Sequence, residues 1–470
     1  MRRRDLLASM AAAGVGGGAL TVTAGRAETV QFPAGFVWGT ATSSYQVEGR
    51  GDRQADTIWD SFARAPGAIV DHSNGDIACD HYHRYADDLA LMAKAGVKAY
   101  RFSISWARVL PTGSGGSDPR GLDFYSRLTD AALKAGIEPW VCLFHWDLPQ
   151  ALQDHGGWSD RLIADRYAEY ASLMAKHLGD RVTRWVTFNE PNVHAIIGHG
   201  FGEHAPGLKS REAMFQALHH QNLAHGKGVQ ALRATGGDRF KLGTVLSLQP
   251  CRPADTAPAS AAAAQLWDAL WNRCVLDPPL LGRYPEALAE YTDDLVQDKD
   301  LAQIRQKLDF LGVNYYSPMY QKTDPAGLIG TGWGAVPEGM PRTAMDWPVD
   351  PQGLLDVLSD LRDHYGNPEL YITENGACFA ETVATDGRVD DAQRVAYLHD
   401  HIAVARRAIA EKVNLRGYFA WTIMDNFEWA KGYTAPFGLM HVDRATLART
   451  PKASYDWFAK LAHSNTLPAA

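Results

Sequence analysis

Short apolar runs alternate with amphipathic segments along most of the chain. Between the runs, apolar side chains recur about every 3.6 residues, as in the series Tyr82, Tyr85, Leu89 and Met92. This period is typical of helices that cover a sheet with one face, and the apolar runs are typical of strands buried on both faces. Eight runs are therefore predicted to be strands, at residues 36–42, 99–105, 139–144, 184–188, 241–246, 310–314, 369–373 and 418–422.

Eight buried strands that alternate with helices predict a parallel sheet covered by helices. No linker or internal repeat divides the eight units, which favours a closed barrel over an open, doubly wound sheet. The predicted fold is α/β, a single (β/α)8 TIM barrel that occupies residues 28–470 as one domain. In such barrels the functional side chains follow the C-terminal ends of the strands. Polar residues at those positions are therefore the candidates for a site.

Residues 1–27 follow a different pattern. Arg2, Arg3 and Arg4 precede a weakly apolar stretch rich in Ala and Gly, and small residues lead to Ala27. A charged start, a short apolar stretch and a small-residue exit are typical of an export signal rather than a membrane span. The string RRDLL at residues 3–7 resembles a twin-arginine signal. We therefore expect a twin-arginine-like signal over residues 1–27 and a periplasmic or secreted protein, with an ordinary secretory signal as the alternative.

The composition excludes several classes of protein. Of 470 residues, 46% are hydrophobic and 21% charged, as in globular rather than disordered proteins. The net charge of −8 and the lack of a basic patch argue against a nucleic-acid partner. Beyond the signal no stretch reaches the roughly 18 apolar residues of a membrane helix, so no membrane partner is expected after signal removal. The sequence leaves the oligomeric state open.

The cysteines do not indicate a structural framework. There are 5 of them, an odd number, and none forms a C-x-x-C pair. This pattern predicts neither a set of disulfides nor a zinc site, although a single bridge remains open.

Two glutamates follow predicted strands at matching places. The string TFNEP places Glu190 after the fourth strand, and the string ITENG places Glu374 after the seventh. A closed barrel brings both strand ends to one face. Two facing carboxyl groups can cleave a glycosidic bond, because one donates a proton to the leaving oxygen while the other, ionised, attacks the anomeric carbon. The structural alternative is a pair of acids that begin helices or turns.

These two roles require environments that push the two pKa values apart. Arg101, inside the second predicted strand, can hold one carboxylate in its ionised form. Tyr316, which follows the sixth strand, can donate its hydroxyl to the same carboxylate. The structural alternative for Arg101 is an ion pair at the base of the barrel.

Seven motifs occur in a fixed order along the chain. They are GTATSSYQVEG (39–49), RFSISW (101–106), HWDLPQ (145–150), TFNEP (187–191), GVNYY (312–316), ITENG (372–376) and DNFEW (425–429). With these motifs the chain resembles the retaining β-glucosidases of glycoside hydrolase family 1, from about residue 32 to residue 461. The resemblance implies hydrolysis of terminal β-D-glucosyl residues through a covalent glycosyl-enzyme, with β-galactosyl and β-fucosyl residues as open alternatives. The implied partner is a β-glycoside from an oligosaccharide or an aryl or alkyl β-glycoside.

The resemblance also assigns roles to individual residues. It implies Glu190 as the acid/base and Glu374 as the nucleophile, supported by Arg101 and Asn314. It implies substrate-binding roles for Gln46, His145, Asn189, Tyr316, Trp421, Glu428, Trp429 and Trp347. Independently of the family, amide, imidazole and carboxyl groups suit sugar hydroxyls, and an aromatic wall suits the apolar face of a pyranose. Each residue also has a structural alternative, such as a core histidine for His145.

Other positions bear on the substrate. Glu428 followed by Trp429 resembles family members that take neutral rather than 6-phosphorylated sugars, although Lys431 lies close by. Pro436 stands where the family often has an Arg, which leaves the support of this loop open. The stretch 327–341 adds unusual glycines before Trp347, which resembles the tryptophan at the family's aglycone entrance.

Three other functions are weighed against this one. His81 and His83 have the H-x-H spacing of metal ligands, but they open a predicted helix, where residues two apart do not share a face. A non-catalytic sugar-binding protein would lack one of the two carboxylates, and both are present. A transglycosidase shares the glycosyl-enzyme and cannot be separated from a hydrolase by sequence. No metal or other cofactor is predicted.

Overall fold

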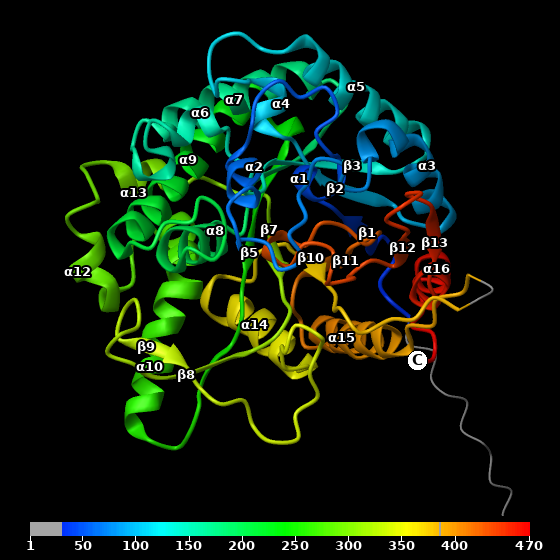
Figure 1. Cartoon of the computed structure of the whole chain (residues 1–470). Helices are drawn as coiled ribbons and strands as arrows, with labels where there is room; N and C mark the ends of the chain where they lie inside the picture. Colours follow the sequence, from blue (N-terminus) through cyan, green and yellow to red (C-terminus); the bar gives the residue numbers. More distant parts are fainter. Residues whose placement is uncertain (1–30, 385–386) are drawn as a thin grey trace, which may run out of the picture.

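Eight parallel strands close into a barrel at the centre of the molecule (Figure 1). The computed structural model describes residues 31–384 and 387–470. The barrel strands are β1 (Val37–Ala41), β2 (Ala99–Ser103), β3 (Glu138–Phe144), β4 (Arg184–Asn189), β5 (Lys241–Ser247), β7 (Phe310–Asn314), β10 (Leu370–Asn375) and β11 (Leu415–Trp421). β1 pairs with both β2 and β11, which closes the sheet. All eight predicted strands are confirmed, and β11 begins at Leu415 rather than at residue 418.

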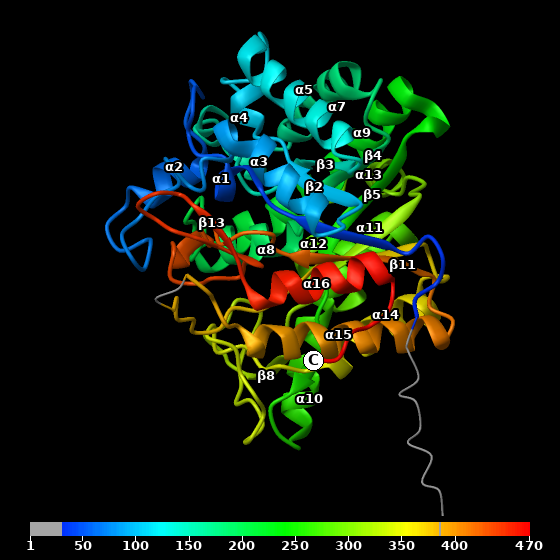
Figure 2. The same ribbon diagram turned by 90° about the vertical axis from the view of Figure 1, so that its right-hand side faces the viewer.

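Helices form a ring around the barrel (Figures 1 and 2). Each barrel strand is followed by at least one of them, so the predicted (β/α)8 barrel is confirmed. The long helices of the ring are α3 (His81–Lys94), α5 (Pro119–Lys134), α7 (Ile163–Leu178), α9 (Arg211–Gly236), α11 (Cys274–Leu281), α14 (Pro351–His364), α15 (Ala392–Ala410) and α16 (Ala453–Ser464). Shorter helices lie in the connections: α1 (Ser44–Val47), α2 (Ile58–Ala63), α4 (Trp106–Val109), α6 (Gln150–Gln153), α8 (Pro191–Ala195), α12 (Ala289–Thr292) and α13 (Asp300–Ile304).

Two small sheets lie outside the barrel. A three-stranded sheet combines β6 (Cys251–Pro253), β8 (Met319–Thr323) and β9 (Thr331–Trp333), and it lies next to α10 (Pro258–Asp268), at the lower left of Figure 1. The strands β12 (Met440–Val442) and β13 (Arg449–Pro451) form the second sheet. The first sheet is made by the connections that follow β5 and β7, and it therefore extends the C-terminal face of the barrel.

Large side chains fill the barrel interior near the N-terminal ends of the strands. The Trp140 ring contacts the rings of Phe310, Tyr371 and Phe419, with centroids 4.8–5.1 Å apart. Glycine makes room for these rings, since a Cβ at Gly39 would lie 2.4 Å from Phe419. The barrel is therefore a packed core at this end. Polar side chains are collected at the opposite, C-terminal end.

Three further expectations concerned an export signal, disulfide bridges and membrane-spanning helices. The predicted export signal at residues 1–27 lies outside the described residues. All five cysteines are free thiols, so no bridge forms among them in this structure. None of the helices in residues 31–384 and 387–470 combines the length and apolar character that a membrane-spanning segment needs.

Candidate active site

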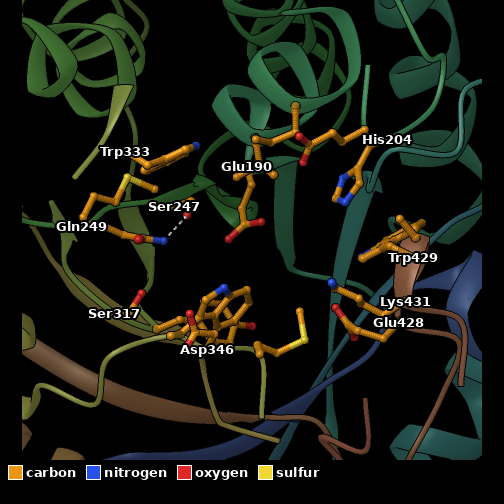
Figure 3. A pocket seen from close by; sticks show the side chains of 18 of the residues that line it. Glu190, His204, Ser247, Gln249, Ser317, Trp333, Asp346, Glu428, Trp429 and Lys431 are labelled. Carbon is orange, nitrogen blue, oxygen red and sulfur yellow. Dashed lines mark hydrogen bonds between the residues drawn. The ribbon is translucent and has the colours of Figure 1, made fainter. Parts of the chain in front are cut away.

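A cavity of about 930 Å³ opens at the C-terminal ends of the barrel strands. Both candidate catalytic glutamates line it, together with His145, Tyr316, Trp421, Glu428, Trp429 and Trp347. Figure 3 shows Glu190 projecting into the cavity, with Glu428 and Trp429 on one side of it and Trp333 and Gln249 on the other. The cavity therefore gathers residues from distant parts of the sequence around Glu190.

Strand ends position the two glutamates. Glu190 directly follows β4 with a φ of 50°, and its N–H donates to the carbonyl of Val245 at 2.8 Å. Glu374 lies within β10, one residue before its end. The two side chains are 5% and 3% exposed, so both carboxyl groups are largely removed from bulk water. A left-handed φ is uncommon for a residue with a side chain, and here the strand pairing holds it.

Glu374 has a fixed cation beside it. The Arg101 guanidinium forms a buried ion pair with the Glu374 carboxylate. The Tyr316 hydroxyl donates to the other oxygen, Oε2, at 2.6 Å. Burial raises the pKa of Glu374 above its ordinary value, and the Arg101 charge and the Tyr316 hydroxyl both oppose that shift. These two groups favour the ionised form, as the sequence predicted, although burial outweighs them in the net direction.

No cation among the described residues forms an ion pair with Glu190, although the Arg101 charge acts on it from a greater distance. The Asn314 amide donates to its Oε1 at 2.9 Å. Burial, and then the negative charge of Glu374, raise the pKa of Glu190 to about 8. At neutral pH the proton of the pair therefore resides on Glu190. Asn314, expected to support the nucleophile, makes its direct hydrogen bond to Glu190, while its amide also lowers the pKa of Glu374.

Asn189 links the two carboxyl environments. Its Oδ1 accepts hydrogen bonds from Arg101 at 2.9 Å and from Asn314 at 3.1 Å. Its Nδ2 donates to His145 Nε2 at 2.9 Å. Burial and the Arg101 charge lower the pKa of His145 well below its ordinary value, so the imidazole is neutral. Nδ1 of His145 is left without a partner among the described residues, although the ring lines the cavity.

A second polar group lies where the loop after β11 meets α1. The Gln46 amide donates to Oε2 of Glu428 and to Oδ1 of Asn426, each at 3.1 Å. The Ser43 hydroxyl donates to Oε1 of Gln46 at 2.7 Å, which fixes the orientation of the amide. Burial, and then the Glu374 charge, raise the pKa of Glu428 to about 8. Gln46 and Glu428 therefore present a rigid hydrogen-bonding edge to the cavity.

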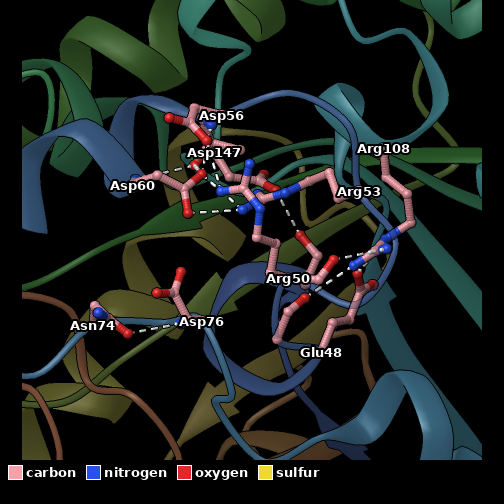
Figure 4. Close-up of polar contacts among 12 residues, drawn as sticks. Glu48, Arg50, Arg53, Asp56, Asp60, Asn74, Asp76, Arg108 and Asp147 are labelled. Carbon is pink, nitrogen blue, oxygen red and sulfur yellow. Dashed lines mark hydrogen bonds and ion pairs between the residues drawn. The ribbon is translucent and has the colours of Figure 1, made fainter.

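Buried ion pairs hold the segment that carries Gln46 (Figure 4). A four-residue helix such as α1 is not stable by itself, so tertiary contacts must position it. Arg108 donates to Glu48 at 2.9 Å, and Ser44 donates to Asp147 at 2.8 Å. Arg53 forms two hydrogen bonds of 2.7 Å with Asp60. These contacts fix residues 44–60 behind the cavity.

Aromatic rings form the wall next to this polar edge. Trp421 ends β11, is buried, and lies nearly parallel to the His145 ring at a centroid distance of 5.9 Å. Trp429 packs against Trp146 at 4.7 Å and Trp59 at 4.5 Å, within an aromatic cluster. Both Trp421 and Trp429 keep part of their surface toward the cavity. The wall suits the apolar face of a sugar ring.

Cations from neighbouring segments support the loop around Pro436. Arg394, from α15, donates to the Pro436 carbonyl at 2.5 Å. Lys452 pairs with Asp425 at 2.8 Å and with Glu381 at 2.7 Å. Arg394 and Lys452 therefore support the loop in which Pro436 stands in place of the family's arginine. His441 lies close to the same two carboxylates, but Lys452 and Arg394 already neutralise the group.

The H-x-H spacing does not build a ligand site. Both histidines lie in α3, as predicted. His81 is buried and its Nδ1 bonds Asp88 at 2.7 Å. His83 is exposed and pairs with Asp80 at the start of the helix. The two rings therefore face different surroundings.

The outer part of the cavity contains residues that sequence reasoning missed. Trp347 lines the cavity as expected, with its ring 5.5 Å from that of Tyr316. Trp333, Gln249 and Ser317 line it as well, and none of them was singled out. Ser247 was also missed, and it lowers the pKa of Glu190 by a hydrogen bond. Ser247 ends β5, so the search for polar residues at strand ends could have found it.

Comparison with known proteins agrees with this geometry. The family model "Glycosyl hydrolase family 1" matches residues 28–467. β-Glucosidase A of Thermotoga maritima is 43% identical over 93% of this chain and 99% of that protein. A bifunctional β-D-glucosidase/β-D-fucosidase of Bifidobacterium breve is 43% identical over 92% of this chain and 98% of its own length. The solved family 1 β-glucosidase from Thermotoga maritima superposes with a TM-score of 0.90, at 42% identity, over 94% of this chain and 100% of that one.

Proposed function

The chain belongs to glycosyl hydrolase family 1, and we propose that it acts within this family as a β-glucosidase that releases terminal β-D-glucosyl residues with retention of configuration. The observation that carries the proposal is the difference between the two buried carboxyl groups. Glu374 is paired with Arg101 and Tyr316, and Glu190 has a pKa raised to about 8. One carboxylate and one carboxylic acid at a single cavity are the equipment of a retaining glycosidase.

The reaction proceeds in two displacements. Glu374 attacks the anomeric carbon, the bond to the leaving oxygen breaks, and the proton of Glu190 goes to that oxygen. Water then attacks the anomeric carbon of the glycosyl-enzyme, the bond to Glu374 breaks, and Glu190 takes the proton from the water. Two inversions give net retention. The carboxylate of Glu374 also stabilises the positive charge that develops on the sugar in each transition state.

Four observations support a neutral glucosyl unit as the group that is transferred. Gln46 and Glu428 provide fixed hydrogen-bond donors and acceptors along one side of the cavity. Asn189 and His145 provide further ones closer to the two catalytic glutamates. Trp421 and Trp429 supply the apolar wall. A carboxyl group at the position of Glu428 disfavours a phosphorylated sugar. The Bifidobacterium relative makes the β-fucosyl group the first alternative to test.

A panel of aryl glycosides tests the proposal. The β-glucoside should be cleaved with the highest kcat/KM, the β-fucoside and β-galactoside with lower values, and the 6-phospho-β-glucoside with the lowest. Proton NMR of the early products should show the β-anomer first. Initial α-product, or a preference for the phosphorylated substrate, would contradict the proposal. Repeating the assay with an acceptor alcohol measures transglycosylation directly, because the alcohol then competes with water for the glycosyl-enzyme.

We further propose that residues 1–27 direct export through the twin-arginine route, so that the mature enzyme works in the periplasm or outside the cell. The string RRDLL at residues 3–7 supports this route, and the family match begins at residue 28, next to the expected cleavage site. Replacing both Arg3 and Arg4 by Lys should leave active, unprocessed enzyme in the cytoplasm. Unchanged export of that double variant would instead favour the general secretory route.

A further inference from the structure

A buried lysine lies behind the loop that carries Glu428 and Trp429. Lys452 directly precedes α16, and its side chain is buried. Its ammonium forms ion pairs with Glu381 at 2.7 Å and with Asp425 at 2.8 Å. Lysine is almost never fully buried unless it is paired, and removing one partner of a buried pair leaves an uncompensated charge. The proposed mechanism assigns no step to this lysine, so its role follows from its contacts.

Asp425 closes the loop of residues 425–438, called here the Glu428 loop, at its base. Its Oδ1 accepts a hydrogen bond from the Gly438 N–H at 2.8 Å, and the same oxygen pairs with Lys452. Its own N–H donates to the carbonyl of Met440 at 2.9 Å. A Cβ at Gly438 would lie 2.1 Å from the Asp425 nitrogen, so the two ends of the loop touch. Lys452 therefore acts at the point where the loop begins and ends.

The other partner of the lysine links it to the second half of the loop. Arg394, from α15, pairs with Glu381 at 2.5 Å and donates to the Pro436 carbonyl at 2.5 Å. Phe437 follows, with its ring 6.2 Å from that of Tyr316, which donates to the nucleophile. The helices α15 and α16 lie side by side outside the barrel (Figures 1 and 2). The network therefore ties the Glu428 loop to two helices of the outer ring.

The start of the loop also positions both partners of the Gln46 amide. Asn426, next to Asp425, accepts one hydrogen bond from Gln46, and Glu428 accepts the other. The Glu428 N–H donates to the Gly432 carbonyl at 2.7 Å, which closes a turn within the loop. A shift of Asp425 would therefore be passed to the hydrogen-bonding edge of the cavity.

The lysine occupies a place that would suit a metal ion. Glu381, Asp425 and His441 each offer one ligand atom, and these atoms lie within 4.8 Å of one another. The Lys452 ammonium already lies within hydrogen-bond distance of both carboxylates. A cation of the chain itself thus holds the two acids together. Without it, two buried carboxylates at this distance repel each other.

We propose that Lys452 is a positioning residue for sugar recognition, which sets the place of Glu428 at the cavity by holding Asp425 against Glu381. Lys452 itself does not line the cavity, so it acts through the Glu428 loop and not on the substrate. Substitutions in such a network change function without any contact to the ligand. This inference rests on the proposed glucosidase function.

A double-mutant cycle between Lys452 and Glu428 tests the proposal. Lys452→Met keeps an unbranched side chain but removes the charge, and kcat/KM for an aryl β-glucoside should fall by about tenfold. In a Glu428→Ala background the same change should cost less than about twofold, because the group that Lys452 positions is gone. In a Gln249→Ala background it should again cost about tenfold, since Gln249 lines the cavity away from the loop. Equal costs in all three backgrounds would show a general structural role and overturn the proposal.

Lys460→Met is the matched control, since Lys460 lies on α16 but is exposed, and its ammonium forms no ion pair with the described residues. It should leave kcat/KM unchanged, and a loss equal to that of Lys452→Met overturns the proposal. If Lys452→Met does not fold, Lys452→Met combined with Glu381→Gln takes its place in the cycle, because this pair of changes removes one of the two repelling carboxylates. The same outcomes then support or overturn the proposal.

Hydrogen exchange separates this inference from the proposed function. If no aryl β-glycoside were cleaved, the proposed function would be wrong, but the position of the Glu428 loop could still be measured. Peptides from residues 425–438, followed by mass spectrometry, should exchange about tenfold faster in Lys452→Met than in Lys460→Met, because the contacts that close the loop are weakened. Equal exchange in the two variants overturns the proposal.

Discussion

The two ends of the active-site cavity are built on different principles. At the inner end, Gln46, Asn189 and Glu428 are each held by at least one hydrogen bond to another side chain of the site. At the outer end, Trp333 and Trp347 present aromatic surface, and the side-chain oxygens of Gln249 and Ser317 form no hydrogen bond with the described residues. The inner end is thus prearranged for one sugar, whereas the outer end offers general stacking surface.

The difference indicates where selectivity resides. A site with fixed, buried hydrogen-bonding groups rejects any sugar that leaves one of them unpaired, because each unpaired buried group costs about 1–3 kcal/mol. Stacking on an aromatic ring accepts many sugars and aglycones of similar shape. We therefore expect substitutions at the inner end to change kcat/KM steeply and those at the outer end to change it by small factors.

The largest expected effect is at the nucleophile. Glu374→Gln removes the carboxylate that attacks the anomeric carbon, and kcat on an aryl β-glucoside should fall by roughly 10⁴-fold or more. The matched control is Glu369→Gln, because Glu369 precedes the same strand at the opposite end of the barrel, where it approaches Arg184. This control should keep nearly full activity. A similar loss in both variants would point to a folding defect, which thermal unfolding would reveal.

The acid/base residue should show an effect that depends on the leaving group. Glu190→Ala should lower kcat/KM by roughly 10²–10⁴-fold for alkyl glucosides, which need protonation of the leaving oxygen. Activated aryl glucosides need little protonation, so their first step should change far less. Azide should then restore turnover and give the β-glycosyl azide, because it can attack the glycosyl-enzyme without a general base. If Glu374→Ala formed the β-azide instead, Glu374 would be the acid/base and Glu190 the nucleophile.

The next largest effect on kcat/KM is expected at the hydrogen-bonding edge formed by Gln46 and Glu428. Glu428→Ala deprives sugar hydroxyls of a partner and removes one of the two acceptors of the Gln46 amide nitrogen, which keeps its hydrogen bond to Asn426. We expect kcat/KM for the β-glucoside to fall by about 10–100-fold. Glu203→Ala is the control, since this acid lines the same cavity but is exposed. Equal losses in the two variants would mean that the buried contacts of Glu428 do not account for its effect.

The residues of the inner end of the cavity could be predicted from the sequence more completely than those of the outer end. The eight strands could be predicted from the local hydrophobic pattern. Both glutamates could then be predicted because they follow strand ends, which a closed barrel brings to one face. The Arg101–Glu374 pair was also predicted, because both residues lie on barrel strands. By contrast, Trp333 depends on a small sheet formed by three segments, and neither its pairing nor its exposure is encoded in a local pattern. The support of Pro436 by Arg394 likewise joins segments 42 residues apart.

The pH profile should be bell-shaped, and one substitution should move only one side of it. Activity requires ionised Glu374, so it falls as the pH drops through the pKa of that group, and it requires protonated Glu190, so it falls as the pH rises through about 8. Tyr316→Phe removes a hydroxyl that lowers the pKa of Glu374. The acidic limb of kcat/KM should therefore move to higher pH while the basic limb moves little. An unmoved acidic limb would mean that the hydroxyl does not act on the nucleophile.

The smallest expected effect is at the outer wall. Trp347 is half-buried, with its ring near those of Tyr316 and Phe437 at 5.5 and 6.1 Å, and it presents part of its surface to the cavity. Trp347→Ala should raise KM for an aryl β-glucoside by about two- to tenfold through lost stacking, with kcat for hydrolysis of the glycosyl-enzyme nearly unchanged. The second displacement no longer contains the leaving group, so a purely outer-end residue cannot affect it directly. A large fall in kcat for that step would show that Trp347 acts through Tyr316 on the nucleophile and belongs functionally to the inner end.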